Sequence, residues 1–236
     1  MRNTMAIAKR EFKSYVNSPI PYILVTAYIA TAGYMFFQQL FIVRQADMRH
    51  FFDNMPLLFC LIVPFVTMRL VAEERREGTL ELLLTMPVTD WQLVFGKFLA
   101  ALGLMSLLLV LTLAFPITVA ALGPLDKGTT VAGYIGAILM SGAFVAIGIM
   151  ASSFTRNQIV AALVAFFIGF GLFLIGALIG VLPPSLAPVA SALSIGSHFQ
   201  NISRGVIDSR DFLYYVSIIF VCLLVAQTTL DSRRWR

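Results

Sequence analysis

Six long apolar runs, separated by short polar stretches, dominate the sequence. A hydrocarbon layer about 30 Å thick is crossed by roughly 20 apolar residues in a helix. Each run is continuous, whereas strands of a membrane barrel alternate between apolar and polar residues over about ten positions. The pattern therefore predicts an all-α membrane protein with six transmembrane helices, in a single domain that spans residues 1–236. The predicted spans lie near 22–43, 55–71, 93–122, 131–154, 159–182 and 212–230.

Residues 1–21, ahead of the first run, have a helical pattern of their own. Met5, Ala8, Phe12 and Val16 recur at helical spacing, and charged residues occupy positions beside them. Two prolines then end the pattern. It predicts an amphipathic helix lying in the membrane interface. An unstructured basic flank is the alternative.

The polar stretch at 72–92 is densely charged. Five consecutive charged residues fill 73–77, although only 12% of the whole chain is charged. Gly78 is expected to break the helix that continues from the second span, and Pro87 to end the leucine-containing stretch that follows. The pattern predicts an amphipathic helix over 79–86, about eight residues and roughly 12 Å long, presented to a partner outside the bilayer. A purely structural interfacial helix is the alternative.

The third span is predicted to begin sharply and then to bend. Thr89 and Gln92 have the spacing of a capping box, and the apolar residues beside them have that of a hydrophobic staple. The helix is therefore expected to begin at Asp90. Pro116 is expected to kink this span, which is longer than a straight crossing requires.

The linker at 183–211 is long and contains three prolines. Within it, the semi-apolar stretch 186–195 is too short to cross a bilayer. We expect a re-entrant or surface-lying helical segment before the sixth span, at the outer face. A plain loop is the alternative.

Composition and charge support an integral membrane protein. The chain is 59% hydrophobic and only 12% charged, whereas soluble domains carry about 25% charged residues. Its net charge of +5 is unevenly distributed, with twelve Lys and Arg in one set of alternate loops and five in the other. The positive-inside rule accounts for this excess without a nucleic-acid partner, and it places both termini and the 72–92 stretch in the cytoplasm.

The sequence offers no residues for catalysis, cofactor binding or metal binding. Gly96-Lys97 is the only Gly-Lys pair, and Phe98 follows it where a P-loop has Ser or Thr. The predicted spans contain no Asp, Glu, Lys or His except at their ends, where Arg69 also lies. Cys60 and Cys222 lie inside spans and are expected to be small buried hydrophobes.

The pair Glu73-Glu74 superficially resembles an intramembrane prenyl endopeptidase. That family requires an arginine where this chain has Gly78, and His50 and His198 lie on the opposite side of the predicted membrane. A coupled carrier is also disfavoured, because coupling carboxylates and broken-helix repeats are not visible.

Two motifs carry a resemblance to a known superfamily. The first resembles permease subunits of ABC type-2 exporters, a likeness that extends over the whole chain. The second resembles the gliding-motility-type (Gld) branch of that superfamily. The first motif is Glu73-Glu74-x-x-x-Gly78-Thr79-Leu80-Glu81-x-Leu83-Leu84-x-x-Pro87-Val88, followed by Gly96-Lys97, and the second comprises Ser197-His198-Phe199, Arg204-Gly205-Val206-Ile207-Asp208, Asp211 and Tyr214-Tyr215.

The resemblance implies an ABC ATPase as partner. The helix at 79–86 would be the coupling helix that sits in a cleft of the ATPase, and the N-terminal helix would be the connecting helix. ATP and Mg would be bound by the ATPase and no cofactor by this chain. The residues expected at this contact are Glu73, Glu74, Glu77, Gly78, Thr79, Leu80, Glu81, Leu83, Leu84 and Pro87.

The resemblance also implies further protein contacts. Two permeases, copies of this chain or related ones, would pair through the first and fifth spans, where Gly169, Gly176 and Gly180 allow close helix approach. Packing within the chain is the alternative for these glycines. A membrane protein with a large extracytoplasmic domain would contact the outer segment, and the residues assigned to that contact are His198, Phe199, Arg204 and Asp208.

We therefore expect a permease in a bacterial inner membrane that couples ATP hydrolysis by a separate subunit to substrate export or to force transmission. It would not itself be an enzyme. The alternative is a stand-alone secondary carrier or a membrane scaffold.

Overall fold

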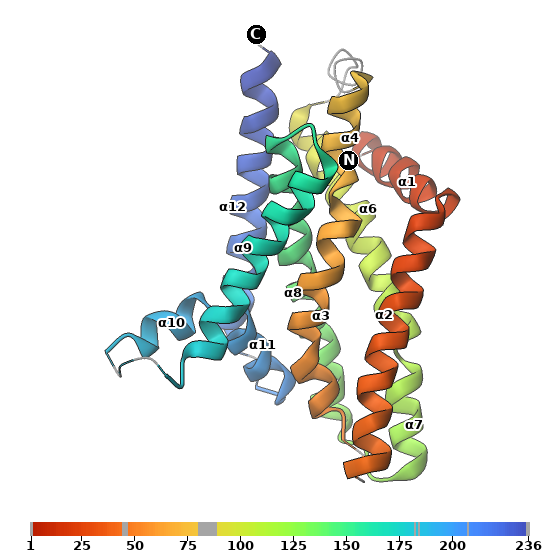
Figure 1. Cartoon of the computed structure of the whole chain (residues 1–236), viewed down its shortest axis with the longest axis vertical. Helices are drawn as coiled ribbons and strands as arrows, with labels where there is room; N and C mark the ends of the chain where they lie inside the picture. Colours follow the sequence, from red (N-terminus) through yellow and green to blue (C-terminus); the bar gives the residue numbers. More distant parts are fainter. Residues whose placement is uncertain are drawn as a thin grey trace.

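The computed structural model describes residues 2–43, 47–79, 89–181, 183, 185–206 and 208–234. In these ranges the regular structure is helical, without strands, and forms an elongated bundle (Figure 1). The helices are α1 (Arg2–Asn17), α2 (Pro19–Gln38) with a π-helical extension (Gln39–Val43), α3 (Arg49–Thr67), α4 (Arg69–Glu77), α6 (Asp90–Leu111), α7 (Ala114–Leu122), α8 (Lys127–Phe154), α9 (Gln158–Leu178), α10 (Ala187–Leu193), α11 (Ile195–Ser203) and α12 (Ser209–Arg234).

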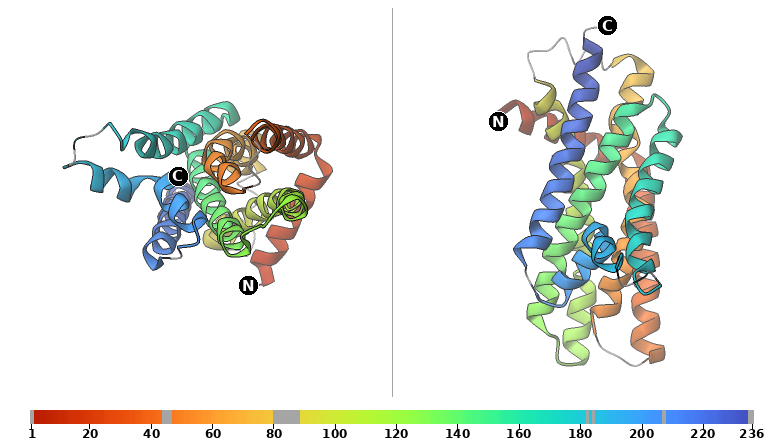
Figure 2. Two further views of the ribbon diagram at one scale, coloured as in Figure 1. Left: turned by 90° about the horizontal axis from the view of Figure 1, so that it is seen from below. Right: turned by 90° about the vertical axis from the view of Figure 1, so that its left-hand side faces the viewer.

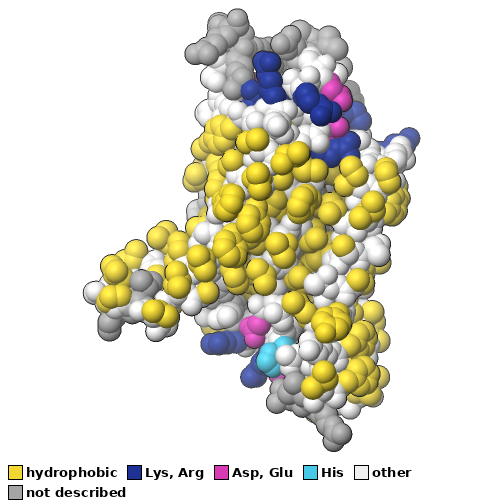
Figure 3. Space-filling model, in the orientation of Figure 1, with side chains coloured by type: hydrophobic (Ala, Val, Ile, Leu, Met, Phe, Trp, Pro, Cys, Tyr) yellow, Lys and Arg dark blue, Asp and Glu magenta, His cyan; other side chains and the backbone are white. Residues whose placement is uncertain are grey.

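Six stretches of the described chain are long and apolar enough to cross a membrane, which confirms the predicted all-α membrane protein. Charged side chains gather at the two ends of the molecule, and hydrophobic ones cover the middle of the face in Figure 3. We call the end with α1, α4 and the last turns of α12 the charged end. The stretches are Pro19–Ile42, Arg49–Glu77, Asp90–Leu122, Lys127–Phe154, Gln158–Leu178 and Ser209–Ser232.

Helix α8 forms the centre of the bundle. It packs against α3, α6, α9, α11 and α12, and these surround it when the bundle is viewed along its length (Figure 2). Its glycines let neighbouring side chains approach the backbone closely. A Cβ built on Gly148 would lie 2.0 Å from Thr67 Oγ1 of α3, and one on Gly136 would lie 2.8 Å from Ile202 Cγ2 of α11.

The third span is broken between α6 and α7, where the sequence predicted a kink. Pro116 has no N–H, so it cannot donate to the carbonyl of Thr112 four residues earlier. The Phe115 amide donates to that carbonyl at 3.0 Å, and the hydroxyl of Tyr134 on α8 also donates to it at 3.0 Å. A side chain of the central helix thus joins a tightened backbone turn at the break.

The linker before the last span contains α10 and α11, so a helical segment is present where it was predicted and the loop alternative is excluded. Helix α10 projects from the side of the bundle, whereas α11 packs against α3, α8 and α9 (Figure 1). Phe199 of α11 is fully buried and Ile195 begins that helix. The linker is therefore anchored in the core by its second helix.

The glycine contact between α3 and α8 gives a matched test of the packing. Gly148→Ala places a methyl group against Thr67, and overpacking of this kind costs about 1–3 kcal/mol. Gly171→Ala is the control, because no described atom lies within 4 Å of a Cβ at that position. Thermal unfolding in detergent is expected to show a lower midpoint for Gly148→Ala only. Equal midpoints would contradict the close contact.

Candidate functional site

The N-terminal helix lies against the start of the third span at the charged end. Ile7 and Phe12 of α1 face Gly96 and Gly103 of α6. A Cβ on Gly96 would lie 2.8 Å from Ile7 Cγ2 and 3.1 Å from the carbonyl oxygen of Thr4, so the two helices are nearly in backbone contact. The predicted amphipathic helix is present. Ala8 and Phe12 of its predicted apolar face lie against the bundle, whereas Met5 and Val16 are exposed.

The start of α6 agrees with the sequence prediction. Thr89 Oγ1 accepts a hydrogen bond from the Gln92 amide at 3.3 Å, and Gln92 Oε1 accepts one from the Thr89 amide at 3.4 Å. This capping box fixes the first turn of α6 from Asp90. Lys97 follows two turns later, where the helix is already inside the protein.

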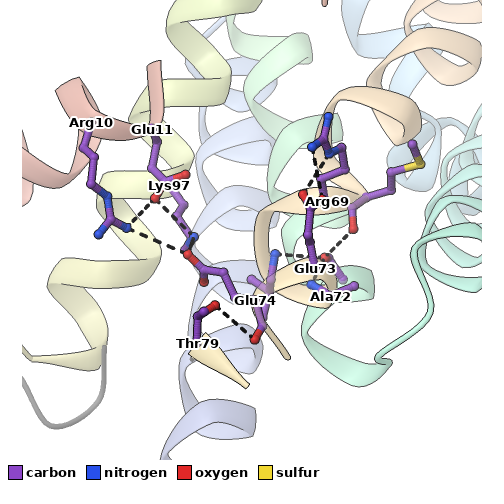
Figure 4. A network of polar contacts seen from close by, with 11 residues as sticks. Arg10, Glu11, Arg69, Ala72, Glu73, Glu74, Thr79 and Lys97 are labelled. Carbon is purple, nitrogen blue, oxygen red and sulfur yellow. Dashed lines mark hydrogen bonds and ion pairs between the residues drawn. The ribbon is translucent and has the colours of Figure 1, made fainter. Parts of the chain in front are cut away.

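Lys97 is the central residue of a buried charge network. Its side chain is 1% exposed, and its Nζ lies 2.7 Å from Glu74 Oε1 and 3.5 Å from Glu11 Oε1. Arg10 Nη2 lies 2.6 Å from Glu11 Oε1 and 3.8 Å from Glu74 Oε1 (Figure 4). Two cations and two carboxylates therefore neutralise one another and join α1, α4 and α6.

This network was not predicted, although the sequence contains a signal for it. Lys97 entered only as a basic residue of the predicted cytoplasmic side and as part of the Gly96-Lys97 pair. A lysine that lies inside an apolar helix after a well-defined cap requires a buried carboxylate, because an unpaired buried ammonium costs several kcal/mol. The contact with Glu11 lies 86 positions away in sequence, so the partner could not be identified from local pattern.

A second ion pair lies within α4, and its arginine also reaches the junction of α1 and α2. Arg69 donates twice to Glu73, with Nε–Oε2 at 2.8 Å and Nη2–Oε1 at 3.1 Å (Figure 4). Its Nη1 also donates to Ser18 Oγ at 3.3 Å. Nearby, the Tyr15 hydroxyl donates to the Val66 carbonyl at 2.9 Å. Burial, with a smaller contribution from the Glu11 carboxylate, raises the pKa of Tyr15 well above its ordinary value.

The second span is broken at Met68, which separates α3 from α4. In a continuous helix the Ala72 amide would donate to the Met68 carbonyl. Instead, Ser152 Oγ of α8 accepts from the Ala72 amide at 3.0 Å and from the Val71 amide at 3.2 Å, and donates to the Met68 carbonyl at 3.0 Å. The hydroxyl of the central helix thus bridges the break and positions α4.

The residues predicted to contact an ATPase are only partly described. Glu73 and Glu74 make the ion pairs above, within the chain, while Glu77, Gly78 and Thr79 are exposed. Gly78 ends α4 in the left-handed conformation, with φ of 71°, as expected of a helix-breaking glycine. Leu80, Glu81, Leu83, Leu84 and Pro87, and with them most of the predicted coupling helix, lie outside the described residues.

Two of the four residues assigned to an outer contact are engaged within the chain. His198 Nδ1 lies 2.5 Å from Asp211 Oδ1, and the His198 ring stacks on Tyr214 with centroids 4.0 Å apart. Phe199 is buried in the core. Arg204 and Asp208 are exposed. Only these last two are placed to meet a partner directly.

Of the three glycines assigned to the dimer seam, two pack against other residues of the same chain and one does not. A Cβ on Gly169 would lie 2.8 Å from Phe144 Cε1, and one on Gly176 would lie 2.2 Å from Ser194 Oγ. These two glycines therefore serve packing within the chain, the alternative left open by the sequence. No described atom lies within 4 Å of a Cβ on Gly180. A contact between copies at these positions stays a prediction.

Lys97→Met is expected to destabilise the protein by about 3–5 kcal/mol, because it leaves Glu74 and Glu11 buried without their central cation. Thermal unfolding in detergent measures the effect, with exposed Lys9→Met as the control. Adding Glu74→Gln to Lys97→Met is expected to recover part of the loss, since it removes one of the uncompensated carboxylates. A Lys97→Met protein as stable as Lys9→Met would contradict the network.

Ser152→Ala is expected to lower stability, because the break at Met68 loses a hydroxyl that serves three backbone groups and each unpaired group costs about 1–3 kcal/mol. The control is Ser153→Ala, whose hydroxyl donates only to the Met150 carbonyl of its own helix. Hydrogen exchange is expected to rise at 71–72 in Ser152→Ala alone. Unchanged exchange at these amides would count against the bridge.

Comparison with known proteins identifies the family. A search of curated proteins finds no match for this chain. The family model described as "ABC-2 family transporter protein" matches residues 2–229, which include the first five spans, most of the sixth and all residues of the charge network. This match over almost the whole length agrees with the resemblance in the sequence and with the helical bundle, and the chain belongs to the ABC-2 family of transporter proteins, as a multi-pass membrane subunit.

Proposed function

We propose that this chain is the permease of an ABC transporter whose separate ATPase docks at the charged end, which faces the cytoplasm. The observation that carries the proposal is the Lys97 network. It ties α1, α4 and α6 together, and α4 and α6 are the helices that precede and follow, along the chain, the segment in which the sequence predicts the coupling helix. A surface that receives force from another protein must be rigidly joined to the helices that are to move.

The contacts around α4 suggest how such force would spread. Glu74 joins α4 to α6 and α1, Arg69 joins it to Ser18 at the start of α2, and Ser152 joins it to α8. A displacement of α4 by a closing ATPase would therefore reach the first span, the third span and the central helix together. The chain would carry out no bond chemistry, and ATP and Mg would be bound by the ATPase.

Pairing of two permeases is the second part of the proposal. Helix α9 exposes a row of apolar side chains that includes Ile159, Leu163 and Phe167, and α2 is also largely exposed. These are the fifth and first spans, which the family resemblance assigns to the seam. We propose a dimer through α2 and α9, formed by two copies or by a related permease.

At the opposite end, α10 and α11 would receive the motion. Helix α11 packs on α3, α8 and α9, so rearrangement of the spans would displace it. Exposed Arg204 and Asp208 follow it. In line with the gliding-motility-type resemblance, we propose that this segment acts on a partner with a large extracytoplasmic domain in a bacterial inner membrane. Export of a substrate along the dimer seam is the second candidate function.

Affinity purification from native membranes in mild detergent tests the proposal. Wild type is expected to recover an ABC ATPase, and a Glu81→Lys, Leu83→Asp variant to lose at least about nine-tenths of it, because the changes disrupt the apolar and acidic contacts of the predicted coupling helix. The matched control, Arg204→Glu with Asp208→Lys, is expected to retain the ATPase and to lose the outer partner.

The outcomes separate the candidate functions. Loss of the outer partner with ATP hydrolysis unchanged supports force transmission, whereas ATPase-dependent release of a substrate without any outer partner supports export. If wild type recovers no ATPase while the bundle stays monodisperse, the coupling proposal fails, and a stand-alone carrier or a scaffold becomes the better account.

A further inference from the structure

A cavity of about 610 Å³ lies at the charged end, between α1, the start of α2, the α3–α4 junction and α6. Its lining changes character along the bundle. Leu24, Phe65 and Leu104 provide apolar walls, whereas Arg10, Glu73 and Glu77 are charged. Phe65 and Glu77 are twelve residues apart, roughly 18 Å along a helix. The cavity therefore extends from the apolar belt to the charged end.

The cavity borders the surface that faces lipid. Ile20, Pro21 and Leu24 of the first span line it, and the adjacent Tyr22 and Ile23 are 58% and 65% exposed. Phe65 both lines the cavity and is 48% exposed. An acyl chain lying along α2 could therefore place its head group in the cavity without leaving the hydrocarbon layer.

The polar part of the cavity has more carboxylates than cations. Its lining contains Arg10 and Arg69, against Glu11, Glu73, Glu74 and Glu77. Arg10 pairs with Glu11, Arg69 with Glu73, and Glu74 with Lys97, so the carboxylate in excess is that of exposed Glu77. A purely anionic head group would meet a net negative wall, whereas an ammonium group would be attracted to it.

Other groups in the lining match the remainder of a phospholipid head. Ser14, Tyr15 and Ser18 contribute hydroxyls, and Arg10, whose side chain is 52% exposed, can reach a phosphate. Glu77, the exposed carboxylate at this wall, is available to accept from a further donor. An ammonium with three N–H donors, next to a phosphate, suits this combination.

We propose that this cavity binds an aminophospholipid of the phosphatidylethanolamine type, from the leaflet at the charged end. The ammonium group lies towards Glu77, the phosphate towards Arg10 and the hydroxyls of α1, and an acyl chain along Leu24 and Phe65. The site is independent of an ATPase partner, so its test can fail while the proposed transport function stands.

Native mass spectrometry of the delipidated protein tests the proposal. The probes are phosphatidylethanolamine, phosphatidylcholine, which lacks ammonium N–H donors, phosphatidylglycerol, which lacks the amine, and dodecylamine, which lacks the phosphate. One phosphatidylethanolamine is expected to bind about tenfold more tightly than each of the other three, the size of one charge-assisted hydrogen bond. Equal binding of the three phospholipids would overturn the proposal, and equal binding of dodecylamine would replace it with a site for cationic amphiphiles.

Two matched pairs of variants locate the site. Leu24→Trp fills the cavity and is expected to abolish the preference for phosphatidylethanolamine. Ile23→Trp, at the exposed preceding position of α2, is expected to keep that preference.

Glu77→Gln is expected to weaken phosphatidylethanolamine binding about threefold to tenfold and to leave phosphatidylcholine binding unchanged. Asp90→Asn, outside the cavity at the same end, is expected to have no effect. Because Glu77 is exposed, its variant tests the proposal even if Leu24→Trp does not fold. A preference unchanged in Glu77→Gln would overturn it.

Discussion

The charged end depends on the neutralisation of one buried ammonium group. Lys97 is almost completely enclosed, and an isolated charge in that position would be strongly unfavourable. The requirement for nearby carboxylates fixes α4 through Glu74 and α1 through Glu11, and Arg10 then balances the two carboxylates. Three helices are thus held at defined positions by a network whose formal charges cancel.

Much of the fold was accessible from sequence because the signals are local. The six spans follow from continuous apolar runs, the start of α6 from Thr89 and Gln92, and the break before α7 from Pro116. The break at Met68 was not predicted, because it depends on a serine 84 positions away that inserts its hydroxyl into the helix. The Lys97 network was missed for the same reason, since its partners converge only in the folded bundle.

In the candidate site, too, local features were predicted and contacts between distant residues were not. The position of Gly78, the exposure of Glu77 and Thr79, and the amphipathic α1 agree with the sequence patterns. The dense charge and the family resemblance assigned Glu73 and Glu74 to a partner contact, but both make ion pairs within the chain. Within one dense run of charges, some residues can therefore form ion pairs inside the chain while others remain exposed to a partner. The sequence alone does not separate the two kinds, because the internal pairs depend on where Arg69 and Lys97 lie in the folded chain.

The separation of Glu74 and Glu11 from Lys97 has a consequence for biogenesis. Glu74 precedes Lys97 by 23 residues and Glu11 precedes it by 86. During synthesis, the second span and the start of the third can therefore pair their charges as a hairpin as soon as Lys97 has emerged from the ribosome. Helix α1, although made before both of these spans, does not meet the Lys97 ammonium until that moment. Its final attachment therefore follows the insertion of the second and third spans, so order of synthesis and order of docking differ.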